Sequence, residues 1–273
     1  MRIKLQVPTD AAGCYLNDIV LLPSCNLLIT DWFNMSVNVI DAHTGRLLSH
    51  VQLRGRPDRL CLLPGNRAAV SLPDNKMILT IDVSADQLKL LDSVNVVGVC
   101  VGLAYLNNNF IVGLEDKHCV ASINIEGKLL KSVSKDNTGK ELFKYPDNIC
   151  VTKEKSSPSI YVSDSGTDTI TRLSEELDVL QTFKVPVKGW PVGLTTAGGG
   201  QLLVGQCGLN DDNRLWVLDT STGEYTELSL GLLGTRTLWC SGACVAFCPR
   251  LGRMYVHMKE FGENDHIQVY EIS

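Results

Sequence analysis

The sequence contains few aromatic residues and no long apolar run, and these absences exclude several classes of fold. Phe, Trp and Tyr make up 6% of the 273 residues. No segment approaches the roughly 18 consecutive apolar residues of a membrane-spanning helix. No stretch of useful length shows the periodicity of an amphipathic helix either. Helical bundles and membrane-spanning helices are therefore not expected, and short strands remain.

Ten cysteines are present, but the spacings typical of a zinc site are missing. No Cys-x-x-Cys pair occurs, and the most closely spaced group, Cys240, Cys244 and Cys248, has no histidine nearby. Other cysteines lie within apolar, strand-like runs, where a free thiol behaves as a small buried hydrophobic group. Residues 2 to 7 alternate polar and apolar side chains, unlike a signal peptide. We therefore expect reduced thiols, a cytoplasmic protein, and neither a metal nor a cofactor.

A strong excess of charge and the common catalytic motifs are also missing. Thirty acidic and 25 basic residues give a formal net charge of −5. This charge does not favour nucleic acid or an anionic membrane as a partner. The sequence has no Gly-x-Ser-x-Gly nucleophile motif, phosphate-binding loop or dinucleotide-binding fingerprint. We expect no enzymatic activity in this chain.

What the sequence does contain is a sixfold internal repeat. Each unit opens on a turn that leads into a short apolar strand, and one apolar anchor position recurs every 41 to 50 residues. A second anchor, at the end of a later strand, recurs in step with the first. Four strands per unit at this period are typical of a β-propeller. The first anchors are Ile19, Leu60, Leu103, Ile149, Leu194 and Cys244.

The sixth unit lacks a fourth strand of its own. It ends directly after its third strand, whereas residues 2 to 7 form a strand that no other unit uses. We expect this N-terminal strand to complete the last blade, because pairing it there removes an open sheet edge. The prediction is an all-β fold, a six-bladed β-propeller with four-stranded blades. It forms a single domain over residues 1–273, with blade 6 made of residues 240–273 plus 1–8.

The repeat resembles that of a known family. Residues 145–149 (Tyr-Pro-Asp-Asn-Ile) and residues 160–166 (Ile-Tyr-Val-Ser-Asp-Ser-Gly) look like the two halves of the NHL repeat. Across the whole chain the pattern is most similar to the C-terminal propeller of tripartite-motif (TRIM-NHL) ubiquitin ligases. In that family the propeller captures a substrate, or an RNA, for a RING domain upstream. The resemblance implies a non-catalytic substrate-recognition propeller of a larger TRIM-type E3 ubiquitin ligase, with single-stranded RNA binding as the alternative.

A binding surface is expected on the rim formed by the turns that enter the inner strands and those between second and third strands. Exposed aromatic side chains in such turns are the usual anchors of protein–protein contacts. An alternative for Trp190, which precedes a proline, is that it wedges between neighbouring blades. The predicted partner-binding residues are Tyr15, Trp32, Phe33, Arg56, Arg59, Trp190, Trp239 and Phe261.

The charges predicted on this rim bear on the kind of partner. Asp31, Asp58 and Glu260 flank the aromatic residues and favour a protein partner that carries Lys or Arg. Acidic residues outnumber basic ones in the rim turns, which disfavours RNA. Arg56 and Arg59 are the one notable basic pair, and we expect them to form ion pairs. The propeller itself is expected to be monomeric.

A metal-dependent propeller hydrolase or lyase is a more distant alternative. It would need acidic, amide or histidine ligands converging on the central channel, but none of the five histidines falls on a predicted inner strand. Asp31, Glu115 and Asp164 follow the second strand of their units at equivalent positions. We expect these carboxylates to accept backbone N–H bonds and hold their turns, rather than bind a metal.

Overall fold

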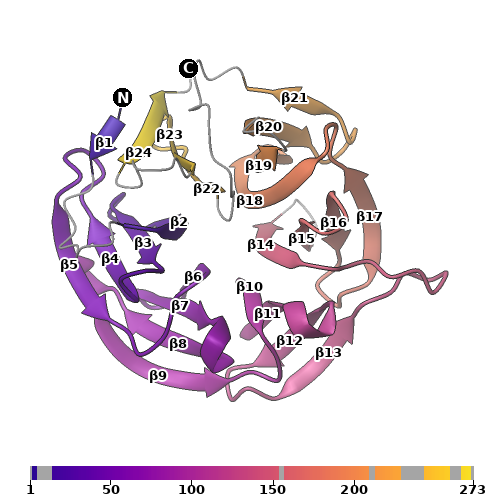
Figure 1. Cartoon of the computed structure of the whole chain (residues 1–273), viewed down its shortest axis with the longest axis horizontal. Helices are drawn as coiled ribbons and strands as arrows, with labels where there is room; N and C mark the ends of the chain where they lie inside the picture. The colour runs from indigo at the N-terminus through magenta and orange to yellow at the C-terminus, as the bar shows by residue number, and fades with distance from the viewer. Residues whose placement is uncertain are drawn as a thin grey trace.

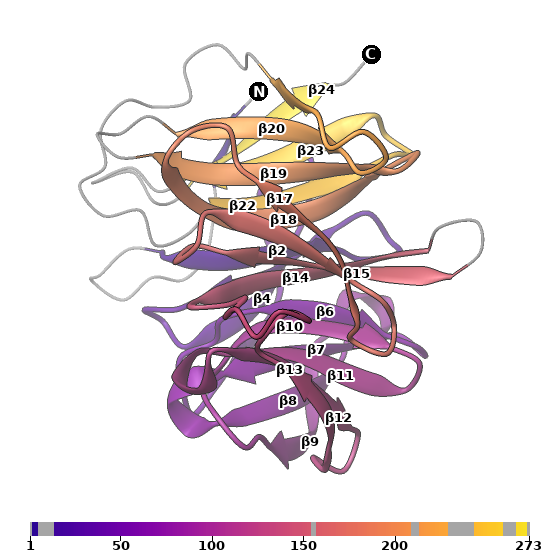
Figure 2. The same ribbon diagram turned by 90° about the vertical axis from the view of Figure 1, so that its right-hand side faces the viewer.

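The computed structural model describes residues 2–4, 14–153, 157–208, 213–228, 243–258 and 266–271. Six four-stranded antiparallel sheets form a ring, with one strand of each sheet closest to the central axis (Figure 1). This arrangement confirms the predicted six-bladed β-propeller. The inner strands run roughly along the ring axis, and the turns between strands gather on two opposite rims (Figure 2). Within the described ranges, no helix is long and apolar enough to cross a membrane.

Blades I to V follow one another in chain order, each running from its inner strand outwards. Blade I consists of β2 (Leu16–Leu21), β3 (Leu27–Asp31), β4 (Ser36–Ile40) and β5 (Leu47–Gln52). Blade II consists of β6 (Leu60–Leu63), β7 (Arg67–Leu72), β8 (Met77–Asp82) and β9 (Lys89–Asn95). Blade III consists of β10 (Cys100–Leu106), β11 (Asn109–Leu114), β12 (Cys119–Asn124) and β13 (Leu129–Val133).

The next two blades have the same layout. Blade IV consists of β14 (Pro146–Lys153), β15 (Pro158–Asp164), β16 (Thr169–Leu173) and β17 (Val179–Lys184). Blade V consists of β18 (Gly189–Gly198), β19 (Gln201–Gly208), β20 (Arg214–Asp219) and β21 (Tyr225–Glu227). Three short 3-10 turns, η1 (Pro73–Asn75), η2 (Ser84–Asp86) and η3 (Glu115–Lys117), connect strands in blades II and III.

Blade VI is built from both ends of the described chain. Its strands are β22 (Ala243–Cys248), β23 (Arg253–Met258), β24 (His266–Glu271) and, outermost, β1 (Arg2–Lys4). Ile3 pairs with Ile267 and is buried in a cluster shared with blade I. Gly45 of blade I has a φ of +72°, and a Cβ there would lie 2.2 Å from the carbonyl oxygen of Lys4. The N-terminal strand therefore closes the ring as predicted, and its close approach to blade I requires this glycine.

The core lies between neighbouring blades, because alternate residues of a strand face opposite sides of its sheet. Ile19 packs towards blade VI, whereas Leu28 of the same blade packs towards Leu60 and Val70 of blade II. In blades I to V the first anchor of the repeat faces the preceding blade. This packing explains why the anchor is apolar in each unit.

The sixth anchor is one residue later than the sequence indicated. In blades I to V the anchor pairs with the second-strand residue Ile29, Val70, Val112, Val162 or Val204. In blade VI the equivalent residue, Val256, pairs with Val245, and Val245 packs towards blade V. Cys244 instead packs towards blade I. The predicted anchor Cys244 was therefore wrong by one residue, because a shift of one residue exchanges the two faces of a strand.

Candidate functional site

A β-bulge recurs near the start of the inner strands and shapes the centre of the ring. In blades I, III, IV and V the register of the first hairpin shifts by one residue at the same place. In blade II, Asp58 donates its N–H to the Ser71 carbonyl, and Ser71 donates its N–H to the Arg59 carbonyl. Asp58 and Arg59 therefore both lie opposite Ser71, as in a bulge. A bulge leaves its extra residue outside the regular ladder. The extra residues are Asn17, Asp58, Val101, Asp147 and Val192.

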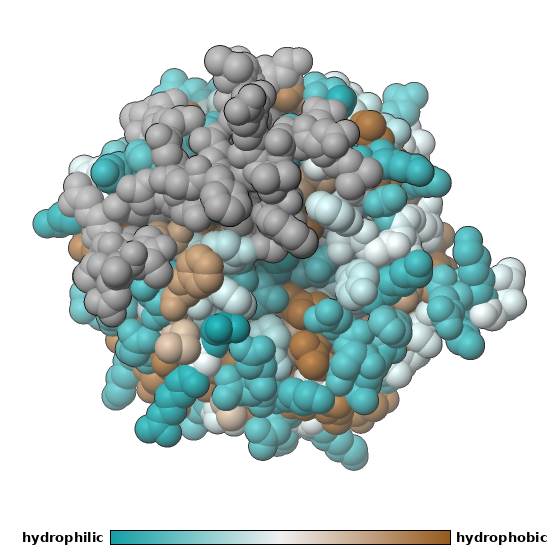
Figure 3. Space-filling view, in the orientation of Figure 1, coloured by the Kyte–Doolittle hydropathy of each residue, from teal (hydrophilic) through white to brown (hydrophobic). Residues whose placement is uncertain are grey.

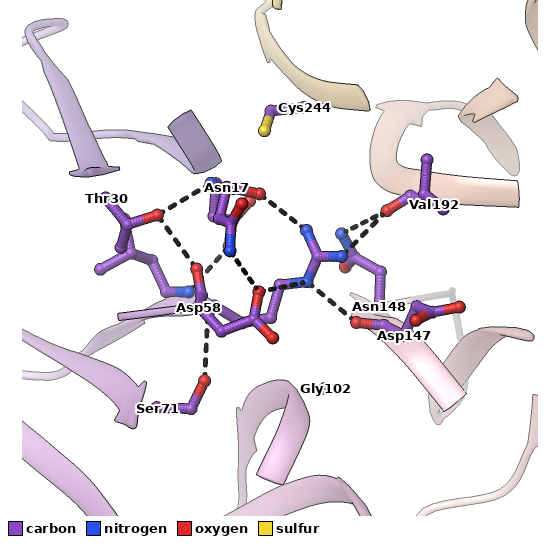
Figure 4. A network of polar contacts seen from close by, with 12 residues as sticks. Asn17, Thr30, Asp58, Ser71, Gly102, Asp147, Asn148, Val192 and Cys244 are labelled. Atoms are coloured by element: carbon purple, nitrogen blue, oxygen red, sulfur yellow. Dashed lines mark hydrogen bonds and ion pairs between the residues drawn. The ribbon is translucent and has the colours of Figure 1, made fainter. Parts of the chain in front are cut away.

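Arg59 spans the centre of the ring and uses three of these carbonyls. Its guanidinium donates from Nη1 to the oxygen of Asn17 (2.8 Å), from Nε to that of Asp147 (2.9 Å) and from Nη2 to that of Val192 (3.3 Å). The Asp58 carboxylate lies 3.7 Å from Nε. Asn17 and Asp58 lie on one side of this network, and Asp147 and Val192 lie on the other (Figure 4). One side chain therefore connects blades I, II, IV and V.

The carboxyl groups of Asp18, Asp58 and Asp147 lie near the guanidinium, and burial alters the ionisation of Asp18 and Asp147. Burial raises the pKa of Asp18 to about 6, although Arg59 and the Leu60 N–H (2.7 Å) oppose the shift. Burial likewise raises the pKa of Asp147 to about 7, against the effects of Ser165 and Arg59. Burial lowers the pKa of Arg59, but Asp58 and Asp18 more than offset this and raise it. Arg59 is therefore a permanent cation between acids that titrate near neutral pH.

Arg59 is thus not on the exposed rim where the sequence placed it. Its side chain is buried, and the whole residue is only 6% exposed. The physical reason is its position directly before the anchor Leu60 of an inner strand. The equivalent positions in the ring are Asp18, Gly102, Asn148, Gly193 and Cys244. In the sequence, the members of this central cluster can be recognised as the residues directly before each anchor. That position was not considered as part of a site.

The turns after the second strands are held as predicted in two blades. Asp31 accepts N–H bonds from Tyr15 and Asn34 (both 3.2 Å). Asp164 accepts N–H bonds from the loop before blade IV, at 2.7 and 3.0 Å, and from its own turn. In blade III the neighbouring Asp116, rather than Glu115, performs this role, by accepting the N–H of Val99 at 2.8 Å. These carboxylates organise the rim loops.

Four of the predicted binding residues come together on the rim of blades I and II. The rings of Tyr15 and Phe33 are 4.6 Å apart, and that of Trp32 lies 5.4 Å from Phe33 and 5.6 Å from Tyr15. The Arg56 guanidinium lies 4.1 Å above the Trp32 ring. Phe33 is 47% exposed and Arg56 is exposed, while Tyr15 and Trp32 are half-buried. We call Tyr15, Trp32, Phe33 and Arg56 the rim patch.

Of the other three aromatic candidates, the structure describes Trp190, which does not join this group. Trp190 lies on β18 of blade V, is 39% exposed and makes no ring contact with another described residue. Blade V is not adjacent to blade I in the ring. Trp239 and Phe261 lie outside the described residues. The rim patch therefore forms where two turns of blade I meet the loop that opens blade II.

The charge around the rim patch differs from the expected one. Asp31 is fully buried, and the side chain of Asp58 is only 16% exposed and lies beside Arg59. Glu260 lies outside the described residues. None of the described carboxylates forms an ion pair with Arg56. The accessible charge of the four rim-patch residues is therefore positive, and of the three acids only Glu260 is left to support the expected Lys- or Arg-bearing partner.

One histidine lies closer to the centre than the sequence indicated. His257, within β23, is buried and pairs across the strands with Cys244. Its Nδ1 lies 3.0 Å from the carbonyl oxygen of His266. In the described part of the chain, no group of three or more His, Cys, Asp or Glu side chains has an arrangement that could hold a metal ion.

Comparison with known proteins supports the fold and not a family. No protein-family model matches the chain, and no curated protein matches its sequence. A streptogramin B lyase structure matches all of this chain over 87% of its own length, with a TM-score of 0.67 and 13% identity. A catalytically inactive virginiamycin B lyase from Staphylococcus aureus with quinupristin matches all of this chain over 89% of its own length, with a TM-score of 0.67 and 16% identity.

A second class of propeller matches almost as well. The β-propeller domain of Myceliophteria thermophila Cps50 (Swd1) aligns with 94% of this chain over 84% of its own length, with a TM-score of 0.63 and 11% identity. Lyases and a domain of another kind thus share this architecture with the chain. Identities this low show the fold alone, because one fold serves many unrelated functions. The chain is a β-propeller, and its function has to be argued from its own residues.

Proposed function

We propose that this propeller is a protein-recognition module that binds its partner through the rim patch. The observation that carries the proposal is the exposed cluster of three aromatic rings with an arginine stacked on one of them. Trp, Tyr and Arg are the residue types that dominate binding energy in protein interfaces. The described part of the face in Figure 3 is mostly hydrophilic, with small, separate hydrophobic areas, so binding there would depend on a few anchors.

The rim patch is also preorganised, which lowers the entropic cost of binding. Asp31 holds the N–H groups of Tyr15 and Asn34, and the Trp32 N–H donates to the carbonyl oxygen of Tyr15 (2.8 Å). These bonds fix the two turns that carry the rings. A partner therefore meets a surface whose aromatic side chains are already in place.

The chemistry of the rim patch favours a peptide segment that combines a large apolar side chain with a carboxylate. The rings of Phe33 and Trp32 offer apolar contact, and the Arg56 guanidinium offers a fork of donors that suits a carboxylate. The stacking of Arg56 on Trp32 restrains that fork. An acidic, aromatic-containing segment is the partner that these groups fit best.

The sequence resemblance extends the proposal to a larger assembly. The NHL-like residues 145–149 and 160–166 support a role as the substrate-recognition propeller of a TRIM-type E3 ubiquitin ligase. In that role the partner would be a ubiquitination substrate, and the ligase chemistry would reside in another domain. The solved lyases share only the fold at 13–16% identity, so we do not extend their activity to this chain.

The test is a peptide-array screen with acidic–aromatic peptides and charge-reversed counterparts, followed by calorimetry on the best binder. We expect Trp32→Ala to weaken binding about thirtyfold, which corresponds to about 2 kcal/mol. Arg56→Ala should weaken binding of acidic peptides selectively. Trp190→Ala is the matched control, because it removes an exposed tryptophan from a different blade, and it should leave affinity unchanged.

Two outcomes would contradict the proposal. Loss of binding in Trp190→Ala but not in Trp32→Ala would move the site to blade V. Binding of a single-stranded RNA oligonucleotide that is tighter than that of any peptide, and lost in Trp32→Ala, would favour the RNA alternative, because bases also stack on aromatic rings.

A further inference from the structure

Two cysteines face each other where blade VI meets blade I. Cys25 lies in the turn between β2 and β3, and Cys248 is the last residue of β22. Their Sγ atoms are 3.7 Å apart although the residues are 223 positions apart in the sequence. Cys248 is buried, whereas Cys25 is only half-buried and is reached by solvent. Both are free thiols in this structure.

The location of this pair is unusual because of how the ring closes. In the sequence β1 precedes blade I, and it joins blade VI without a covalent link, through three pairings with β24 and the packing of Ile3. No covalent link holds β22, β23 and β24 against blade I within the described residues. A bond between Cys25 and Cys248 would supply that link and make the closure of the ring covalent.

The surroundings of Cys25 suit oxidation chemistry. The Arg250 guanidinium donates to the Sγ of Cys25 at 2.8 Å, and a guanidinium stabilises a thiolate. Burial and the neighbouring Cys248 raise the pKa of Cys25, and Arg250 acts against this shift. Oxidation should therefore be faster at alkaline pH. Burial raises the pKa of the Cys61 and Cys100 thiols well above the usual range, which makes them poorer candidates.

We propose that Cys25 and Cys248 form a reversible disulfide that covalently closes the propeller when a hydroperoxide oxidises the protein. The Cys25 thiolate attacks one peroxide oxygen, the O–O bond breaks, and hydroxide leaves to become water. The Cys248 thiolate then attacks the sulfur of the resulting sulfenic acid. The S–S bond forms, the S–O bond breaks, and a second water is released. Overall, two thiols and one hydrogen peroxide give one disulfide and two waters, and a dithiol reductant reverses the change.

The disulfide would act on the stability of the ring and not on the rim patch directly. Cys25 precedes β3, whereas Trp32 follows its far end, so the two lie at opposite ends of the same strand. A crosslink between residues so distant in sequence removes much of the freedom of the unfolded chain. We expect the melting temperature of the oxidised protein to rise by about 10 °C.

The experiment treats the reduced full chain with hydrogen peroxide at pH 8.5. Peptide mapping by mass spectrometry without reduction identifies the disulfide, and differential scanning fluorimetry gives the melting temperature before oxidation, after oxidation and after dithiothreitol. The expected result is a Cys25–Cys248 peptide, a rise in melting temperature and its reversal. Cys119→Ser, which changes a buried cysteine in blade III, should keep all three.

The decisive variant is Cys25→Ser, because a half-buried position in a turn tolerates this change better than Cys248 does. It should lose both the crosslinked peptide and the rise in melting temperature. Arg250→Met should slow disulfide formation severalfold. The proposal is overturned if peroxide yields no Cys25–Cys248 peptide, or if Cys25→Ser keeps the peroxide-dependent rise.

Discussion

Arg56 and Arg59 are three positions apart in the chain, but their surroundings are opposite. Arg56 lies on the rim, stacked on Trp32 and open to solvent. Arg59 lies across the centre of the ring, where backbone carbonyls of three other blades accept its hydrogen bonds. Arg56 belongs to the loop before Pro57, whereas Arg59 is the residue before an inner-strand anchor. The position in the repeat, and not the residue type, decides which arginine can meet a partner.

The same contrast applies to the acidic residues. Asp31 on the rim accepts backbone N–H bonds that hold its turn. At the centre, burial raises the pKa values of Asp18 and Asp147. The acids therefore differ in role: Asp18 and Asp147 surround the central cation, whereas the buried Asp31 holds a turn of the rim. Each prediction below tests one part of this difference.

The largest effect is expected from removing the central arginine. Arg59→Met leaves Asp18, Asp58 and Asp147 without their cation and removes one donor from each of three carbonyls. Breaking a buried ion pair in this way typically costs about 3–5 kcal/mol in the free energy of unfolding. Arg56→Met, the matched change on the rim, should cost no more than about 0.5 kcal/mol. Urea denaturation followed by circular dichroism measures the free energy of unfolding of both variants. Equal losses of stability would show that the two arginines do not differ in their structural role.

The second prediction concerns pH. Asp18 and Asp147 have folded-state pKa values of about 6 and about 7, above the ordinary value of 3.8. Their contribution to stability is fully present below pH 3.8 and is lost as the pH rises through about 7, because the unfolded chain ionises first. Each pKa unit corresponds to about 1.4 kcal/mol, so each carboxyl accounts for a loss of roughly 3–4 kcal/mol across this range.

Denaturation curves at pH 4 to 8 for the wild type and for Asp147→Asn provide the measurement. The wild type should lose stability across this interval, and the variant should lose less of it between pH 6 and 8. Half-buried acids in outer turns, such as Asp41 and Asp219, have lowered pKa values, so they titrate below the interval and do not mask the effect. A wild-type curve that rises with pH would show that Arg59 dominates over burial.

The smallest effect is expected at the carboxylate beneath the rim patch. Asp31→Asn keeps the shape of the side chain but weakens its bonds to the N–H groups of Tyr15 and Asn34. We expect a loss of about 1 kcal/mol in stability and a severalfold loss of affinity for the peptide partner. Asp164→Asn, the equivalent change in blade IV, should lower stability similarly and leave affinity unchanged. Identical affinities for the two variants would show that Asp31 does not position the rim patch.

The ring was predictable because its signals repeat. Six apolar anchors, turn residues between short strands and one unassigned N-terminal strand define the blades and their closure. Three rings of the rim patch were also predictable, because Trp32 and Phe33 are neighbours in the chain and Tyr15 lies in the adjoining turn. Their meeting with Arg56 follows from blade II coming directly after blade I.

The centre was not predictable from the same signals. Propensity and periodicity locate a strand to within a residue or two, but a β-bulge changes the facing of side chains by one residue. That uncertainty is why Cys244 was taken for an anchor and Arg59 for a rim residue. The capping role of Asp31 was predicted, but sequence does not show whether a capping aspartate stays exposed, so Asp31 was also counted as surface charge although it is buried.

The recurring bulge separates the chemistry of the axis from the scaffold that surrounds it. Backbone carbonyls provide the hydrogen-bond acceptors on the axis, and no substitution removes them. The residues at six equivalent positions determine which side chain occupies the axis. In this chain those positions hold Asp18, Arg59, Gly102, Asn148, Gly193 and Cys244. Evolution or protein design can therefore replace the axial cation with another group, or provide it from another blade, without changing the rest of the strand sequences. The fold is in this sense a frame that can carry different chemical groups on its symmetry axis.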